Sequence, residues 1–147
     1  MPVDVTLARN FTFELNTGTI AVPNFVAVEG IDNLTHTPAT VRSEARTFDD
    51  VGRSRHIVAS RGDTFAFTGK YKVDEATGAR APGQEAVEAW ANEFGPLPNG
   101  IKQCRITDTS GLNVITFNGS AEVTRFGGGN DDAATWGFTV EVDGPIT

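Results

Sequence analysis

The stretch that decides the fold is Thr64-Phe65-Ala66-Phe67-Thr68-Gly69-Lys70-Tyr71-Lys72-Val73. Its aromatic, glycine and valine positions alternate with threonine, alanine and lysine, so that every second side chain points to the same side of an extended chain. Residues 115–123 and 136–143 repeat this alternation, with Ile115, Phe117, Ala121 and Val123 in one and Trp136, Phe138, Val140 and Val142 in the other. The pattern is typical of antiparallel strands that have one face on a core and one in water.

Weaker strand patterns occupy the ranges between these segments. We expect strands at residues 10–15, 22–31, 55–60 and 101–107, separated by turns at 16–18, 61–63, 108–111 and 127–131, where Gly, Asn, Asp and Ser gather. Residues 101–126 are predicted to form a hairpin whose second strand is the longer one. The fold class expected is therefore mainly β and antiparallel, sandwich-like or barrel-like.

A single segment has helical periodicity. Val87, Trp90, Ala91 and Phe94 recur at i, i+3, i+4 and i+7, which predicts one apolar stripe. Pro82 suits the first turn of a helix, and Gly95-Pro96 should end it. We expect one helix flanking the sheet, and eight residues to lie in the common core: Phe65, Phe67, Trp90, Phe94, Phe117, Val123, Trp136 and Phe138.

Length and charge limit the classes of protein. The 147 residues suit one domain, residues 1–147, and the net charge of -7 argues against tight binding of a phosphate backbone. Five arginines lie within residues 42–61, whereas the residues from 120 onward are acidic. Two interpretations stay open: complementary surfaces on two copies of the chain, or an ordinary solvated surface.

Residues 35–55 have no regular hydrophobic period, and we expect a long loop there. Loops longer than about 12–15 residues in compact domains are usually functional or disordered, and a partner surface would explain this one. The N-terminal residues do not resemble a secretory signal, and no apolar run reaches the roughly 18 residues of a membrane span. A soluble protein made in a cytoplasm is expected.

The inventory of chemical groups does not indicate an enzyme, a metal site or a cofactor. Of the two histidines, His36 lies beside the arginine-rich segment and His56 lies in it. His36 with Ser43-Glu44 is the one conceivable hydrolase set, and no Gly-x-Ser-x-Gly sequence supports it. The lone Cys104 lies on a predicted strand, where a small core residue is expected. The acidic pairs at 49–50 and 131–132 lack the spacing of a calcium loop.

The order of these features carries a resemblance to a known family. Residues 47–52 and 61–69 are similar to a family loop followed by its "sF.ltG" strand. Residues 82–85 with the helix after them, the Gly111 turn, residues 128–131 leading to Trp136, and the closing residues 140–144 also match. This arrangement resembles the tail tube proteins of long-tailed bacteriophages, which are related to the inner tube proteins of contractile injection systems.

The resemblance implies a structural virion protein with no enzymatic activity. Six copies would form a ring, and stacked rings would enclose the channel for genome ejection. The implied partners are further copies of the chain, tail terminator and initiation or baseplate proteins, a tape measure protein in the lumen, and phage DNA in transit without tight binding or a membrane. The implied location is the virion tail, after assembly in the host cytoplasm.

Two sets of residues are expected to carry this role. The self-assembly loop would use Arg42, Glu44, Arg46, Phe48, Asp49, Asp50, Arg53 and Arg55. The channel wall would use Glu122, Thr124, Thr139 and Glu141, unless these residues face the outer solvent. Two other functions remain open: a monomeric β-barrel module that binds a ligand, and a tail terminator or completion protein of the same fold that forms one ring.

Overall fold

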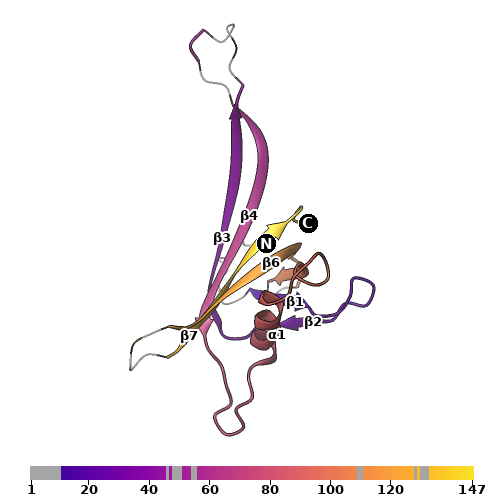
Figure 1. Cartoon of the computed structure of the whole chain (residues 1–147), viewed down its shortest axis with the longest axis vertical. Coiled ribbons are helices and arrows are strands. Elements are labelled where there is room, and N and C mark those ends of the chain that lie inside the picture. Colours follow the sequence, from indigo (N-terminus) through magenta and orange to yellow (C-terminus); the bar gives the residue numbers. More distant parts are fainter. Residues whose placement is uncertain are drawn as a thin grey trace, which may run out of the picture.

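The computed structural model describes residues 11–45, 47, 51–53, 56–108, 111–127, 129 and 133–147. These residues form one sheet and one helix (Figure 1). The elements follow in the order β1 (Thr12–Asn16), β2 (Phe25–Ala27), β3 (Ile31–Glu44), β4 (His56–Lys70), α1 (Pro82–Ala91), β5 (Lys102–Thr107), β6 (Val114–Gly127) and β7 (Thr135–Asp143).

The seven strands pair in the order β2-β1-β5-β6-β7-β4-β3, and every pairing is antiparallel. The expectation of a mainly antiparallel β fold with one helix is confirmed. The described strands do not close into a barrel, because β2 and β3 are the two edges of the sheet and do not pair with each other. The predicted hairpin is formed by β5 and β6, of which β6 is the longer.

The sheet curls until its two halves touch. The rings of Phe13 in β1 and Phe67 in β4 have centroids 4.7 Å apart, although three strands lie between β1 and β4. In a flat sheet four strand spacings of about 4.8 Å would separate them far more widely. The curl therefore encloses the core much as a sandwich does, and α1 covers part of the same face through Val87 and Trp90.

The core contains most of the residues singled out by the alternating pattern. Phe65, Phe67, Trp90, Phe117, Trp136 and Phe138 are each at most 3% exposed, and Val123 packs at the margin of this cluster. Cys104 is also fully buried, in β5, and burial raises the pKa of its thiol.

Phe94 was expected in the core, and that expectation is wrong: its side chain is 90% exposed. The helix ends at Ala91, because the N–H groups of Asn92 and Glu93 bond three residues back, to the carbonyls of Ala89 and Trp90. These tighter turns take the chain off the helical path. Phe94 therefore never reaches the fourth position of the apolar stripe.

Residues 35–44 of the expected loop at 35–55 belong to β3. The expected strand at 55–60 is found from His56 as the beginning of β4, and the expected turn at 61–63 also lies inside β4. Arg61, Gly62 and Asp63 pair with Thr40, Ala39 and Pro38 of β3. This part of the ladder has no core beneath it, so neither face had to be apolar and no alternation marked the strand. The predicted strand at 22–31 is also interrupted: β2 ends at Ala27, and Gly30 turns the chain with a positive φ of 85°.

Gln84 joins α1 to the sheet. Its fully buried side-chain amide donates to the carbonyls of Lys70 and Glu29 at 2.8 and 3.0 Å, and its carbonyl accepts from the N–H of Lys72 at 3.0 Å. Without the Gln84 amide, each of these three backbone groups would lose a hydrogen-bond partner near the point where β4 leaves the sheet. One side chain thus sets where the helix begins relative to β3 and β4.

Candidate functional site

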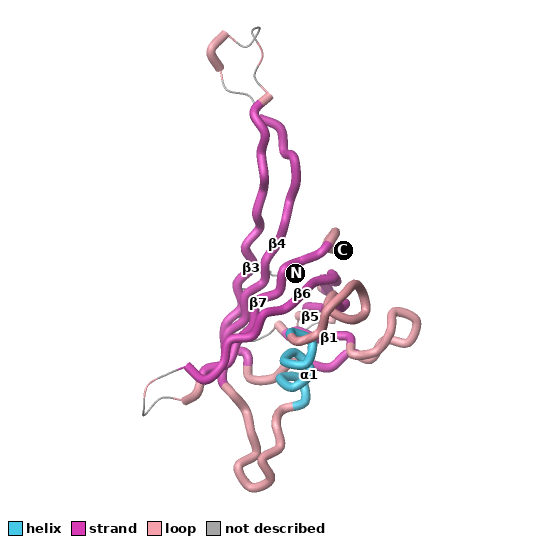
Figure 2. Tube along the Cα trace, viewed as in Figure 1, coloured by secondary structure: helices cyan, strands magenta, loops and turns pink. Residues whose placement is uncertain are grey.

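The most distinctive surface is a two-stranded projection that we call the arm. It consists of residues 38–44 of β3 and 56–63 of β4. Residues 64–70 of β4 are held between β3 and β7, whereas residues 56–63 pair with β3 alone. Figures 1 and 2 show the two strands rising side by side, away from the rest of the molecule.

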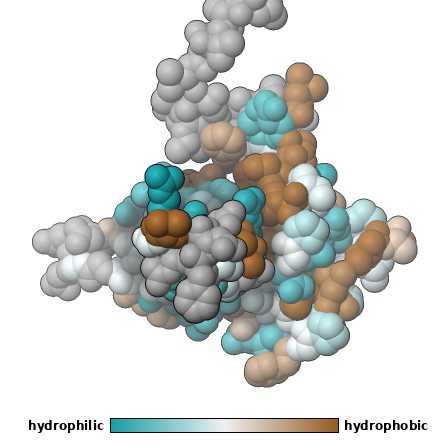
Figure 3. Space-filling model, turned by 90° about the horizontal axis from the view of Figure 1, so that it is seen from above, coloured by the Kyte–Doolittle hydropathy of each residue, from teal (hydrophilic) through white to brown (hydrophobic). Residues whose placement is uncertain are grey.

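The composition of the arm does not suit a free ribbon in water. Val41, Ile57 and Val58 are 57, 59 and 47% exposed. An isolated two-stranded ribbon is at best marginally stable in water, and exposed apolar side chains add no stability to it. Viewed from the arm end, the molecule shows apolar residues interspersed among the polar ones (Figure 3). The arm therefore has the properties of a segment that completes its packing against a partner.

The base of the arm is anchored to the core through His36. Its ring stacks on Phe65 with centroids 4.4 Å apart, and its Nε2 lies 2.9 Å from Oδ1 of Asp63. Ser43 and Glu44 lie seven and eight residues further along the same strand, about 23 Å away or more at 3.3 Å per residue. The three residues weighed as a hydrolase set are thus spread along the arm and do not form a site.

The residues expected in the self-assembly loop fall into two groups. Arg42 lies opposite Val58 and Glu44 opposite His56 in the arm ladder, and Arg53 is exposed in the connection between the two strands. Arg46, Phe48, Asp49, Asp50 and Arg55 lie outside the described residues. Arg42 and Glu44 therefore belong to a strand pair, and Arg53 to the connection between its two strands.

The four residues expected at the channel wall share one face of the sheet. Glu122 of β6 pairs with Thr139 of β7. Two residues away on either side in the same ladder, Glu141 pairs with Ser120 and Thr124 pairs with Gly137. Glu122, Thr124 and Glu141 are exposed and Thr139 is half-buried. Their strand neighbours Val123, Phe138 and Val140 point to the core, so this polar face is the outer side of the curled sheet.

A network around Glu88 links α1 to this sheet. Arg80 donates two hydrogen bonds of 2.9 Å to the Glu88 carboxylate, Trp136 Nε1 donates one of 3.0 Å, and Arg125 lies 3.3 Å away. The hydrogen bonds from Arg80 are the main cause that lowers the pKa of Glu88, and the same pairing raises the pKa of Arg80.

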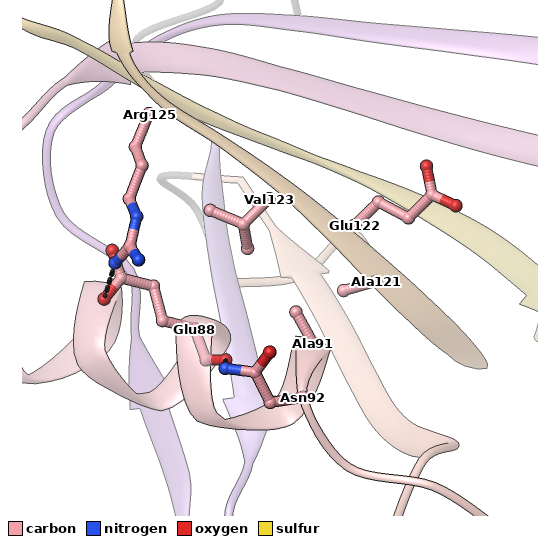
Figure 4. Close-up of a pocket in the computed structure, with 7 residues that line it drawn as sticks. All are labelled: Glu88, Ala91, Asn92, Ala121, Glu122, Val123 and Arg125. Atoms are coloured by element: carbon pink, nitrogen blue, oxygen red, sulfur yellow. Dashed lines mark hydrogen bonds and ion pairs between the residues drawn. The ribbon is translucent and has the colours of Figure 1, made fainter.

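Figure 4 shows Glu88 and Arg125 beside a hollow of about 300 Å³ between α1 and β6, also lined by Ala91, Asn92, Ala121, Glu122 and Val123. The Glu88 carboxylate is already held by three side chains, so the network is suited to fixing the helix on the sheet and not to proton transfer.

Sequence reasoning missed a second projection, at residues 17–24 between β1 and β2. Its tip exposes Ile20 and Val22 at 61 and 75%. The buried Asn16 shapes this loop, since its Oδ1 accepts from the N–H groups of Gly18 and Asn24 at 2.9 and 3.0 Å. The sequence feature that could have indicated this projection is the absence of charged residues between Leu15 and Val28.

In the described part of the chain, no three His, Cys, Asp or Glu side chains converge as they would around a metal ion. No helix among the same residues has the length and hydropathy to cross a membrane.

Comparison with known proteins reveals the fold but no sequence family. Neither the protein-family models nor the curated proteins yield a match. Among solved structures, the chain is similar to the tail of an empty gene transfer agent particle refined with C6 symmetry, with a TM-score of 0.71 and 8% identity over 97% of this chain and 98% of that one. It is also similar to the SPP1 tail tube, with a TM-score of 0.61 and 16% identity over 94% of this chain and 76% of that one.

A third similar structure is the anti-feeding prophage baseplate, with a TM-score of 0.57 and 11% identity over 100% of this chain and 96% of that one. All three alignments cover nearly the whole of the present chain. They confirm, at the level of the fold, the resemblance to phage tail tube proteins that the order of the sequence features indicated.

Proposed function

We propose that this chain is a structural subunit of a tail tube, which assembles with its own copies into six-membered rings that stack around a channel for DNA. The observation that carries the proposal is the arm: two strands that extend beyond the sheet with exposed Val41, Ile57 and Val58 and no core beneath them. Such a ribbon is stabilised when a neighbouring subunit covers it.

The fold supports this function. The similar structures come from a gene transfer agent tail, a phage tail tube and an anti-feeding prophage baseplate, and the first was refined with C6 symmetry. The likeness covers almost the entire chain, including the region of the arm. A ring of six copies related by rotation is the arrangement that the C6 symmetry of that tail suggests for this chain as well.

The edges of the sheet provide a way to join copies side by side. Among the described strands, β3 pairs with β4 alone and β2 with β1 alone, so each has one side along which no other described strand pairs with it. Edge strands of this kind pair readily with strands of another molecule. A heterologous contact between two different edges closes into a ring when the rotation between copies is right.

The polar face of the sheet suits a channel through which DNA passes without sticking. Glu122 and Glu141 are exposed on this face, and the whole chain carries a net charge of -7. Carboxylates lining a channel repel phosphate groups, which favours sliding over binding. We therefore assign Glu122, Thr124, Thr139 and Glu141 to the channel wall as part of the proposal.

The remaining partners follow from the same role. A tube needs a terminator and an initiating or baseplate protein at its ends and a tape measure protein in its lumen, and it would lie in the virion tail after assembly in the host cytoplasm. No catalytic activity is proposed, in keeping with the separation of His36 from Ser43 and Glu44 along β3.

Negative-stain electron microscopy of the purified protein tests the proposal, after concentration or addition of tail initiation components. We expect rings and tubes with a central hole and sixfold end views. Single rings that never stack would instead indicate a terminator or completion protein. Persistent monomers under all of these conditions would contradict the tube function and favour the ligand-binding module.

A further inference from the structure

A groove lies at the opposite end of the molecule from the arm. The loop of residues 71–81, between β4 and α1, forms it together with Glu29, and it encloses about 630 Å³ while remaining open to solvent. Tyr71, Val73, Ala79 and Ala81 supply its apolar lining, and Val73 is 43% exposed. The charged residues that line it are Glu29, Lys72, Asp74, Glu75 and Arg80.

This loop is a preformed structure. The N–H of Asp74 donates to the Ala79 carbonyl at 2.7 Å, and the N–H of Gly78 donates to the Asp74 carbonyl at 2.6 Å. The Asp74 carboxylate accepts from the N–H of Ala76 at 2.9 Å, and Val73 bridges to Arg80 as a strand pair. The groove therefore exists before any partner arrives, which lowers the entropic cost of binding.

Arg80 does not neutralise the acidic residues of the groove. Its guanidinium donates two hydrogen bonds to Glu88 and lies 4.0 Å over the Tyr71 ring. Because Arg80 is engaged in this way, Lys72 is the remaining cation of the groove lining. It stands against three carboxylates, those of Glu29, Asp74 and Glu75. The groove thus combines an apolar lining with an excess of negative charge.

The arm and the groove lie at the two ends of one strand. β4 begins at His56 in the arm and ends at Lys70, directly before the groove loop. Its 15 residues span about 50 Å at 3.3 Å per residue. Figure 1 shows the arm at one end of the long axis of the molecule and this loop at the other. Neither surface can reach the other within one chain, but the two can meet between copies that stack head to tail.

The charges of the two ends are opposite in sign. Residues 42–61 contain five arginines against Glu44, Asp49 and Asp50, whereas the groove contains Glu29, Asp74 and Glu75 against Lys72 and Arg80. Complementary charge favours contact of unlike ends, and contact of like ends is disfavoured by repulsion. The stacking direction would thereby be set by the subunit itself.

We propose that the groove of one copy receives the tip of the arm of a copy in the next ring. Val51, which is 87% exposed at the tip, would lie against the apolar lining, and Arg53 would face Glu29 and Glu75. This inference rests on the proposed tube function and adds to it the receiving surface for the arm. A contact between two different surfaces repeats without closing along the tube axis, as stacking requires.

Site-directed cross-linking tests the inference. The double variant Arg53→Cys with Glu75→Cys is assembled, treated with a short bis-maleimide and separated on a denaturing gel. The native Cys104 is fully buried with a raised thiol pKa, so it should not react. We expect a ladder of dimers, trimers and longer chains, because each copy would be linked to the copies above and below it.

The matched control replaces Glu122, an exposed acidic residue outside the groove, in the double variant Arg53→Cys with Glu122→Cys. Tubes that give no ladder with the groove variant, or an equal ladder with the control, would overturn the groove assignment and leave the tube function standing. A failure to form any rings or tubes would contradict the proposed function itself, and with it this inference.

A charge exchange provides an independent measurement. Arg53→Glu alone and Glu75→Arg alone should each reduce the yield of tubes several-fold, and the two changes together should restore most of it. Circular dichroism of each variant monitors folding of the subunit. Equal loss in the double and single variants would exclude the contact between these two positions.

Discussion

Trp136 Nε1 in β7 donates a 3.0 Å hydrogen bond to Oε1 of Glu88 in α1. The same carboxylate accepts from Arg80, which precedes the helix, and lies 3.3 Å from Arg125 in β6. One acidic side chain thus connects α1 to β6 and β7, which lie far from it in the sequence. It holds α1 against the end of the sheet from which the groove loop emerges.

The variant Glu88→Gln should lower the free energy of unfolding by about 1–3 kcal/mol at pH 7, mainly because the largely buried Arg80 guanidinium loses its counter-charge, with a smaller loss at the exposed Arg125. Urea unfolding measures the loss, with Glu122→Gln as the exposed control. An unfolding free energy equal to that of the control would show that the network does not stabilise the fold.

The effect of Glu88 should depend on pH. Its pKa in the folded chain lies below the ordinary value of 4.5, so its contribution is fully present above pH 4.5 and is lost as the pH falls through the folded pKa. The difference in unfolding free energy between the wild-type chain and Glu88→Gln should therefore shrink below pH 4.5. A difference that stays constant down to pH 2 would contradict this assignment.

Gln84→Leu should destabilise the fold by at least about 2 kcal/mol, because three backbone groups lose a buried hydrogen-bond partner. Thermal or urea unfolding measures the change. The neighbouring Glu85→Gln, at an exposed position of the same helix, serves as the control and should change little. Similar stabilities of the two variants would mean that water replaces the amide without cost.

Truncation to alanine should affect the unfolding free energy little at one phenylalanine and strongly at another. Phe94→Ala, at a position 90% exposed, should change the unfolding free energy by no more than about 0.5 kcal/mol. Phe117→Ala, at a position 2% exposed, should cost about 3–5 kcal/mol. Denaturant unfolding compares them. A large loss with Phe94→Ala would place its ring back in the core.

Exposed apolar residues of the arm should matter for assembly and not for the fold of the subunit. The double variant Val41→Thr with Ile57→Thr retains β-branched side chains and should leave the unfolding free energy within about 0.5 kcal/mol. Electron microscopy should show far fewer tubes. Ile20→Thr, at a site 61% exposed outside the arm, is the control; if it reduced tube formation equally, the arm would have no special role.

The strands with a core beneath them were predictable from the sequence. In β4, β6 and β7 the apolar side chains alternate because one face of each strand is buried, and this local pattern survives any arrangement of the other strands. The same is true of α1 up to Ala91, where the apolar stripe identified Trp90 as a buried residue.

The arm was not predictable in this way. Residues 38–44 and 56–63 pair with each other beyond the edge of the core, so burial imposed no alternation, and apart from the strand expected at 55–60 the sequence resembled a loop and a turn. The groove also escaped prediction. Glu29 and the loop of residues 71–81 are far apart in the chain, and the hydrogen bonds of Gln84 to Glu29 and Lys70 hold them together.

The sequence by itself therefore determined that this chain forms antiparallel strands with one helix, because side-chain alternation depends on local burial alone. Only the tertiary structure decided the order of the strands, the curl that brings Phe13 onto Phe67, and the placement of arm and groove at opposite ends. These features depend on contacts between residues distant in the chain, which no local pattern encodes.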